Sequence, residues 1–208
     1  MGGGYVMPRV GTPDEPLRAA VLVSGGGSGL AALLAYQSSN PCSHRTVLVL
    51  SDSSEARGLE HGLAAGVKTI GIPIPEGPSS RREHEKLIHE ELEREDIELV
   101  VLSGYMRILT PDFVSLWKGR LVNIHPSLLP EFPGAHAHRD ALAAGATVSG
   151  CTVHLVDEGV DSGRILEQRE VPVLRGDTEA DLQDRIKAVE HKLYPLALDR
   201  LSTGGYSF

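Results

Sequence analysis

The sequence predicts an α/β protein whose doubly wound, mostly parallel sheet is flanked by helices and carries an antiparallel strand near its C-terminal end. Two observations predict this fold. Short apolar runs alternate with segments of helical pattern as far as residue 125, as they do in parallel sheets with helical crossovers. Further along, two strand-like segments follow each other without a helix between them, which is typical of an antiparallel addition at a sheet edge.

The first expected strand, residues 17–23, leads directly into the glycine-rich turn 24–29 and then into a helix that includes residues 30–35. Backbone N–H groups at the start of such a helix favour an anion. The turn matches the dinucleotide-binding fingerprint poorly, because Leu30 stands where the third glycine belongs, and no Gly-Lys-Ser/Thr follows as in a P-loop. A tight strand-to-helix turn that binds nothing is therefore the alternative to an anion site.

The other expected elements follow from apolar runs, helical periodicity and caps. Thr110 and Thr178 are in position to cap helices, and Pro111 suits a first helical turn. In a charged helix near the middle of the chain, Leu87 and Leu92 are expected to face the core. The further strands are expected over residues 46–50, 67–72, 97–102, 149–156 and 164–173, and the further helices over residues 57–65, 79–95, 139–144 and from Thr178 onward.

The stretch 121–133 is the most informative in the chain. It begins as a buried strand, but three prolines end the strand near His125, because each removes a backbone donor and fixes φ. Asn123 and His125 are two residues apart, so their side chains point to the same face at the strand end, where open α/β sheets bind ligands. An amide can donate to an oxyanion and an imidazole can move a proton near neutral pH. This pair predicts a catalytic site.

Several other polar positions allow both a binding role and a structural one. Asp52 can contact a ribose or cap the next helix. The run 106–109 can line a ligand pocket or pack in the core. Asp161 can aim its carboxylate at a ligand or serve only as a turn residue. Lys187 and Glu190 are three positions apart on the last helix, a spacing that suits an ordinary surface ion pair.

Composition limits the classes of function. At 208 residues and 22.3 kDa, we expect one domain over residues 17–202, preceded by a flexible leader over residues 1–16. The net charge of −8 argues against a nucleic-acid partner, and no apolar run reaches membrane length. Two cysteines without a CxxC motif indicate a reducing cytoplasm. Three histidines, His125, His136 and His138, raise the question of a metal, but their spacing is a weak ligand pattern, so no metal is expected.

Several motifs together resemble a known family. The run Asn123-Ile-His-Pro-Ser-Leu-Leu-Pro130, with Asp161-Ser-Gly163 downstream, is similar to the 10-formyltetrahydrofolate-dependent formyltransferases, which have a Rossmann-like fold. The resemblance extends from about residue 17 to residue 201. The supporting motifs are Ser24-Gly-Gly-Gly-Ser28, Gly104-Tyr-Met-Arg-Ile-Leu109, Gly134-Ala-His-Ala-His138 and Glu190-His-Lys-Leu-Tyr-Pro195.

The resemblance implies an enzyme that moves the formyl group of 10-formyltetrahydrofolate to the amino group of glycinamide ribonucleotide. The products are N-formylglycinamide ribonucleotide and tetrahydrofolate, in the third step of de novo purine synthesis. It implies a catalytic trio in which Asn123 donates to the oxyanion, His125 assists it and moves the proton, and Asp161 orients the imidazole. The family needs no metal.

The resemblance also implies two sets of binding residues. The ribotide set is Gly27, Ser28, Gly29, Met106, Pro126, Lys187 and Glu190. The folate set is Arg81, Arg107, Ile108, Leu109, Val156, Asp157 and Val160. Arg81 is expected to meet the glutamate tail of the folate. One departure concerns Gly29, where family members commonly carry Asn, so that a side-chain contact to the ribotide is lost while the backbone donor remains.

Related activities and one different class are the alternatives. A methionyl-tRNA formyltransferase usually adds a C-terminal barrel and a basic surface, and a formyltetrahydrofolate deformylase adds an N-terminal regulatory domain, neither of which this length and charge accommodate. A non-catalytic nucleotide-binding module would use only the glycine turn and would leave Asn123, His125 and Asp161 unexplained. The expected partners are the two small-molecule substrates, without nucleic acid or membrane, for a monomer or a homodimer.

Overall fold

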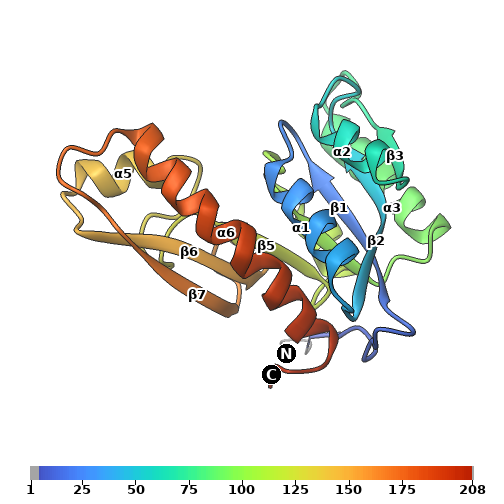
Figure 1. The fold of residues 1–208 in the computed structure, drawn as a ribbon. Coiled ribbons are helices and arrows are strands. Elements are labelled where there is room, and N and C mark those ends of the chain that lie inside the picture. Colours follow the sequence, from blue (N-terminus) through green and yellow to red (C-terminus); the bar gives the residue numbers. More distant parts are fainter. Residues whose placement is uncertain (1–4, 208) are drawn as a thin grey trace.

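The fold is a single seven-stranded sheet covered by helices on both faces (Figure 1). The computed structural model describes residues 5–207. The strands are β1 (Leu17–Val23), β2 (His44–Ser51), β3 (Lys68–Gly71), β4 (Leu99–Leu102), β5 (Leu121–His125), β6 (Val148–Leu155) and β7 (Ile165–Pro172). The helices are α1 (Ser28–Ser39), α2 (Gly58–Ala64), α3 (Ser80–Arg94), α4 (Pro111–Leu116), α5 (Ala137–Ala143) and α6 (Glu179–Ser202).

The strand order is β3-β2-β1-β4-β5-β6-β7. The first five strands pair in parallel, β6 runs antiparallel to β5, and β7 runs antiparallel to β6. The predicted fold class is therefore confirmed. The order turns outward in both directions from β1 and β4, so the carboxyl ends of these two strands form the switch point at which open α/β sheets bind ligands.

Both faces of the sheet are buried at its central strands, and β1 shows why its sequence is apolar without alternation. Ala19, Val21 and Val23 belong to one core cluster, which also contains residues of α1 and α6. Ala20 and Leu22, between them, point to a second cluster with residues of α3 and α4. A strand covered on both faces reads as a continuous apolar run.

The last helix ties the centre of the sheet together. Its start at Glu179 follows the capping box that Thr178 forms with Asp181, as the sequence predicts. Further along, the buried hydroxyl of Tyr194 faces the carbonyl oxygens of Leu102 in β4 and Val122 in β5, at 2.9 and 3.0 Å. This contact links α6 to the last residue of β4 and to the first half of β5. Figure 1 shows α6 crossing the sheet beside α1.

One core assignment was wrong. Leu87, expected to face the core, is 42% exposed, whereas its neighbour Ile88 is buried. The helical period explains the difference, because Ile88 and Leu92 are four residues apart and share a face with His84. Leu87 precedes Ile88 by one residue, which places it about 100° away around the helix axis from the buried face.

The segment before β1 is attached to the domain from Tyr5 onward. The N–H of Gly11 donates to the carbonyl of Ser202 at 2.8 Å, and Arg9 forms an ion pair with Glu98 at 2.6 Å. These contacts join residues 9 and 11 to the domain, the flexibility expected for residues 1–16 stays a prediction, and Met1 to Gly4 lie outside the described residues. Within residues 5–207, every helix is too short or too polar to cross a membrane.

Candidate active site

The site begins where β5 ends. The strand ends at His125, directly before Pro126, as the prolines predict. Asn123 lies opposite His154 in the antiparallel register of β5 and β6. Directly opposed side chains are close neighbours in such a pair, and Nδ2 of Asn123 is 3.3 Å from Nε2 of His154. The sheet therefore places an amide and two imidazoles in one corner.

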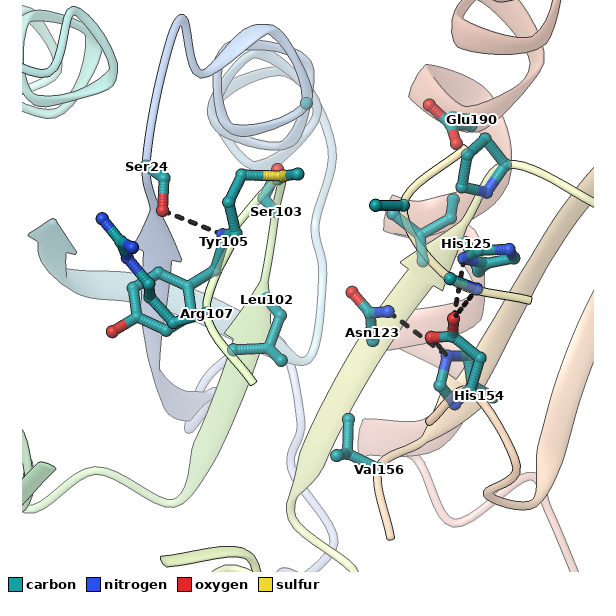
Figure 2. A pocket seen from close by; sticks show the side chains of 18 of the residues that line it. Ser24, Leu102, Ser103, Tyr105, Arg107, Asn123, His125, His154, Val156 and Glu190 are labelled. Atoms are coloured by element: carbon teal, nitrogen blue, oxygen red, sulfur yellow. Dashed lines mark hydrogen bonds and ion pairs between the residues drawn. The ribbon is translucent and has the colours of Figure 1, made fainter. Parts of the chain in front are cut away.

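Asp161 completes this corner from the loop between β6 and β7. Its Oδ2 lies 3.3 Å from Nδ1 of His125 and its Oδ1 lies 3.6 Å from Nε2 of His154 (Figure 2). The same carboxylate accepts a hydrogen bond from the N–H of Gly134 at 2.8 Å. Asp161 has a φ of 51°, a left-handed conformation that non-glycine residues rarely adopt. It is a turn residue, but its carboxylate faces both imidazoles.

Gly163 allows the loop to reach this position. A Cβ added there would stand 1.7 Å from the carbonyl oxygen of Leu155, which is closer than any atoms can approach. The loop can therefore fold tightly back onto the end of β6 only with glycine at this position. The glycine of the Asp-Ser-Gly motif thus serves to bring the carboxylate of Asp161 to His125.

Both nitrogens of the buried His125 ring face hydrogen-bond acceptors. Nδ1 faces the Asp161 carboxylate, and Nε2 lies 2.8 Å from the carbonyl oxygen of Phe132. These two contacts, on opposite sides of the ring, set the orientation of the imidazole at the end of β5.

The second imidazole of the site belongs to His154. Burial lowers the pKa of His154, and its Nδ1 lies 3.0 Å from the carbonyl oxygen of Leu155. In the neutral ring, Nδ1 donates to this carbonyl and Nε2 accepts a proton of the Asn123 amide. The second proton of that amide stays available to a ligand. Sequence reasoning assigned His154 no role, although the register of β6 against β5 would have placed it opposite Asn123.

These residues form one wall of a cavity of about 820 Å³. Figure 2 shows Asn123, His125, His154 and Glu190 across the pocket from Ser24, Ser103, Tyr105 and Arg107. With one exception, the cavity is lined by all the predicted catalytic, ribotide and folate residues: Gly27, Ser28, Gly29, Met106, Arg107, Ile108, Leu109, Asn123, His125, Pro126, Val156, Asp157, Val160, Asp161, Lys187 and Glu190.

The exception is Arg81. It lies in the first turn of α3, is exposed, and is absent from the cavity lining. Its assignment to the folate tail is therefore a prediction that concerns a ligand extending beyond the cavity. Sequence reasoning also missed Ser24, Ser103, Glu179 and Gln183, which line the cavity but belong to elements whose packing alone brings them there.

The glycine turn lies at one end of the cavity. Gly27 has a φ of 69°, and a Cβ there would stand 2.5 Å from Cα of Gly58, so glycine is required for two reasons. Gly27 caps α1 without a side chain, which leaves the first-turn N–H groups facing the cavity. His191 approaches this turn, with its Nε2 3.3 Å from Oγ of Ser28.

Lys187 and Glu190 lie on the face of α6 that lines the cavity. Among the described residues, no ion pair joins the two side chains, so the interpretation as a surface ion pair was wrong. Burial raises the pKa of Glu190 to about 7, and the positive charge of Lys187 opposes this shift. A cation and a carboxyl that titrates near neutral pH therefore face the same space.

The loop 104–109 forms the opposite wall. Met106 and Ile108 are both 66% exposed, so the alternative of core packing was wrong for them. Asp52 does not cap α2 and is absent from the cavity lining, and its buried carboxylate accepts a hydrogen bond from Nε of Arg107 at 2.6 Å. The Ser24 hydroxyl accepts a hydrogen bond from the N–H of Met106 at 2.9 Å. The ends of β1 and β2 thus hold this loop in place.

The histidines of the Gly-Ala-His-Ala-His motif are separated by the structure. His136 is exposed at the N-cap of α5, while His138 is buried within this helix and lines the cavity. Within residues 5–207, no group of three or more His, Cys, Asp or Glu side chains is arranged to hold a metal ion.

Comparisons with known proteins agree with this geometry. A family model described as formyl transferase matches residues 17–198. The chain is 40% identical to the phosphoribosylglycinamide formyltransferase of Escherichia coli (strain K12) over 184 residues, 88% of this chain and 86% of that protein. A crystal structure of glycinamide ribonucleotide transformylase 1 from Symbiobacterium toebii superposes with a TM-score of 0.89 at 41% identity, covering 93% of this chain and 91% of that one.

Another relative is much longer. The chain is 46% identical over 189 residues to the trifunctional purine biosynthetic protein adenosine-3 of Drosophila pseudoobscura pseudoobscura. The aligned region is 90% of this chain but only 14% of that protein. The matching family model spans most of the chain, and the alignment with the Escherichia coli protein covers most of both proteins. The chain therefore belongs to the formyl transferase family.

Proposed function

We propose that this protein transfers the formyl group of 10-formyltetrahydrofolate to the amino group of glycinamide ribonucleotide. The products are N-formylglycinamide ribonucleotide and tetrahydrofolate, as in the third step of de novo purine synthesis. The observation that carries the proposal is the convergence of Asn123, His125 and Asp161 on one wall of a cavity that ends at the N-terminus of α1. One end of the cavity suits a phosphate and the opposite wall suits a flat, largely apolar ligand.

The chemistry is an acyl transfer. The substrate amine attacks the formyl carbon, and a tetrahedral intermediate with a negatively charged oxygen forms. The free amide proton of Asn123 donates to that oxygen, a contribution whose loss typically costs about 10²–10³ in rate. Collapse of the intermediate breaks the bond to N10 of the folate, which leaves as a secondary amine once it has received a proton.

His125 supplies the positive charge and the proton. As an imidazolium it stabilises the oxyanion, and its proton can pass to the departing folate nitrogen while the attacking amine loses one. In the present conformation its Nε2–H is bonded to the Phe132 carbonyl. The ring must therefore exchange this carbonyl for the reacting atoms when the substrates bind. Asp161, whose carboxylate faces Nδ1, keeps the ring oriented during that exchange.

His154 serves as a positioning residue in this scheme. Its neutral ring accepts a hydrogen bond from one N–H of the Asn123 amide. This bond fixes the orientation of the amide so that its second N–H points to the substrate. Its other nitrogen is bonded to a backbone carbonyl of its own strand, so the ring cannot turn freely. The cross-strand pair of β5 and β6 thus orients the oxyanion donor.

The substrate contacts follow from the two ends of the cavity. The N–H groups of Gly27, Ser28 and Gly29 and the ammonium group of Lys187 bind the ribotide phosphate. Met106, Pro126 and Glu190 contact the rest of the ribotide, and Glu190 binds the glycinamide or the ribose. The folate ring lies against Arg107, Ile108, Leu109, Val156, Asp157 and Val160, and Arg81 meets its glutamate tail.

Several wider properties belong to the same proposal. Residues 17–202 act as one formyltransferase domain. The two substrates are its only partners apart from a second copy of the chain, and no metal takes part. The reducing environment that its two buried, unpaired cysteines suit is the cytoplasm.

The experiment is an assay of formyl transfer with purified protein. Glycinamide ribonucleotide is mixed with 10-formyltetrahydrofolate, or with its 5,8-dideaza analogue, and the deformylated folate is followed by absorbance. We expect its formation to depend on the ribotide. Folded protein that produces no deformylated folate, or produces it equally without the ribotide, would refute the proposal, and the second outcome would indicate a hydrolase.

A further inference from the structure

The first turn of α1 has an unusual neighbour in Ser103. This residue follows β4 directly, and its N–H donates to the carbonyl of Leu22 in β1 at 2.9 Å. Its side chain is directed at Gly29, because a Cβ added to Gly29 would stand only 2.5 Å from Oγ of Ser103. The Ser103 hydroxyl therefore occupies the space that any side chain at position 29 would enter.

Among residues 5–207, no hydrogen bond engages the Ser103 hydroxyl, although the residue as a whole is only 7% exposed. The two other serine hydroxyls that line this cavity are engaged. The Ser24 hydroxyl accepts a hydrogen bond from the N–H of Met106, and the Ser28 hydroxyl lies 3.3 Å from His191. The Ser103 hydroxyl is therefore the serine hydroxyl of this cavity that keeps both its donor and its acceptors for a ligand or water.

The surroundings of this hydroxyl select an anion. It lies beside the first turn of the twelve-residue helix α1, whose N–H groups point into the cavity without backbone acceptors. Lys187 faces the same cavity from α6. Figure 2 places Ser103 on the wall across from Asn123 and His125, away from the reacting groups. A hydroxyl in this place donates to a bound anion rather than taking part in the chemistry.

We propose that Ser103 is a specificity-determining residue that donates a hydrogen bond to the phosphate of the ribotide and replaces the side chain missing at Gly29. The inference rests on the proposed function, because that function assigns the phosphate to this end of the cavity. It accounts for the pairing of the two residues, since Gly29 leaves the space and Ser103 fills it with a donor. The lost contact at position 29 is thereby restored from a different element of the fold.

The first experiment compares Ser103→Ala with the wild type by titration calorimetry. The ligands are glycinamide ribonucleotide, the corresponding riboside without the phosphate, and ribose 5-phosphate. We expect Kd for the two phosphate-bearing ligands to rise about tenfold or more, and Kd for the riboside to change by less than about twofold. Ser38→Ala, an exposed serine at the other end of α1, is the matched control and should bind all three ligands as the wild type does.

The second experiment is a double-mutant cycle with Gly29→Ala. In the wild-type background the new methyl group displaces the Ser103 hydroxyl, so the affinity for ribose 5-phosphate should fall. In the Ser103→Ala background the nearest atom to that methyl is Cβ of residue 103 at 3.9 Å, an ordinary contact, so little further loss is expected. Thermal melts of the four proteins confirm that each is folded.

The outcomes separate this inference from the proposed function. Equal effects of Ser103→Ala on ribotide and riboside, no effect on either, or additive losses in the cycle would overturn the role of Ser103, even if the wild type transfers formyl groups. A wild type without transfer refutes the proposed function on its own. In that case a loss of ribose 5-phosphate binding in Ser103→Ala still supports the phosphate contact, and its absence still rejects it.

Discussion

The carboxylate of Asp161 lies 3.3 Å from Nδ1 of His125, although His125 ends a central strand and Asp161 belongs to a loop between the last two strands. The antiparallel return of β6 beside β5 brings the loop to this corner, and its tight turn at Gly163 completes the approach. The contact places a carboxylate beside the imidazole that is proposed to move the proton.

Asp161→Asn removes the negative charge of the Asp161 side chain and keeps its size and shape. An amide of the same size fills the same space but neither stabilises an imidazolium nor accepts from it with both oxygens. We expect kcat to fall by about 10²–10⁴ with KM for the ribotide nearly unchanged, because acid–base assistance is lost while ribotide binding is not. Steady-state kinetics give both constants. A loss of less than about threefold would show that His125 works without this carboxylate.

His125→Ala removes the proposed acid and oxyanion partner itself. The expected loss in kcat is about 10²–10⁴ at neutral pH. His136→Ala is the matched control, because His136 is exposed at the start of α5 and is absent from the cavity lining. If the two alanine variants were equally active, His125 would have no part in the reaction.

Lys187→Ala tests the phosphate end of the cavity. Loss of the ammonium group should raise KM for the ribotide about tenfold or more, because hydrogen bonds between an ammonium group and a phosphate are among the stronger ones. KM for the folate should be unchanged. Lys192→Ala, on an exposed face of the same helix, is the control. Similar increases in both Michaelis constants would reject a phosphate-binding role.

Asp52→Asn tests the support of the opposite wall. The buried Asp52 carboxylate holds Nε of Arg107, and with it the loop whose exposed Met106 and Ile108 face the cavity. Without the negative charge the loop loses its ionic anchor, so KM for the folate should rise about three- to tenfold. KM for the ribotide should rise less, because Met106 is the one residue of this loop that contacts the ribotide. An unchanged KM for the folate would mean that Ser24 and the backbone position the loop without Asp52.

His44 should make stability depend on pH, far from the active site. It is fully buried beside Asp199, and burial lowers its pKa to about 4 although the Asp199 charge opposes the shift. The unfolded chain, whose histidine has its ordinary pKa of 6.5, therefore binds more protons than the folded chain between those values. The contribution of neutral His44 to the free energy of unfolding is complete above pH 6.5 and is lost as the pH falls towards 4.

Thermal or urea unfolding of the wild type and of His44→Asn between pH 4 and pH 7.5 tests this prediction. The wild type should lose on the order of 2–3 kcal/mol more stability than the variant on acidification, whatever the stability of the variant at pH 7.5. Parallel curves for the two proteins would show that His44 is not responsible.

The sequence alone determined the order and type of the elements, because apolar runs, proline positions and threonine caps are local signals. Residues 121–133 show this most clearly, since the prolines ended β5 at His125 as predicted. The family could also be inferred from the sequence, because the motif around Asn123 and His125 is specific. The face of α3 was misjudged at Leu87, where a rotation by one residue decided burial.

Only the tertiary structure decided which side chains meet. The pairing of Asn123 with His154 depends on the register of an antiparallel strand that follows much later in the chain, and the anchoring of Arg107 by Asp52 depends on the neighbouring ends of β2 and of the loop after β4. The contact between Ser103 and Gly29 has no sequence signal at all, since a glycine and a serine are unremarkable apart. Local chemistry specifies elements over a few residues, whereas a site is made by contacts between distant residues that only chain folding brings together.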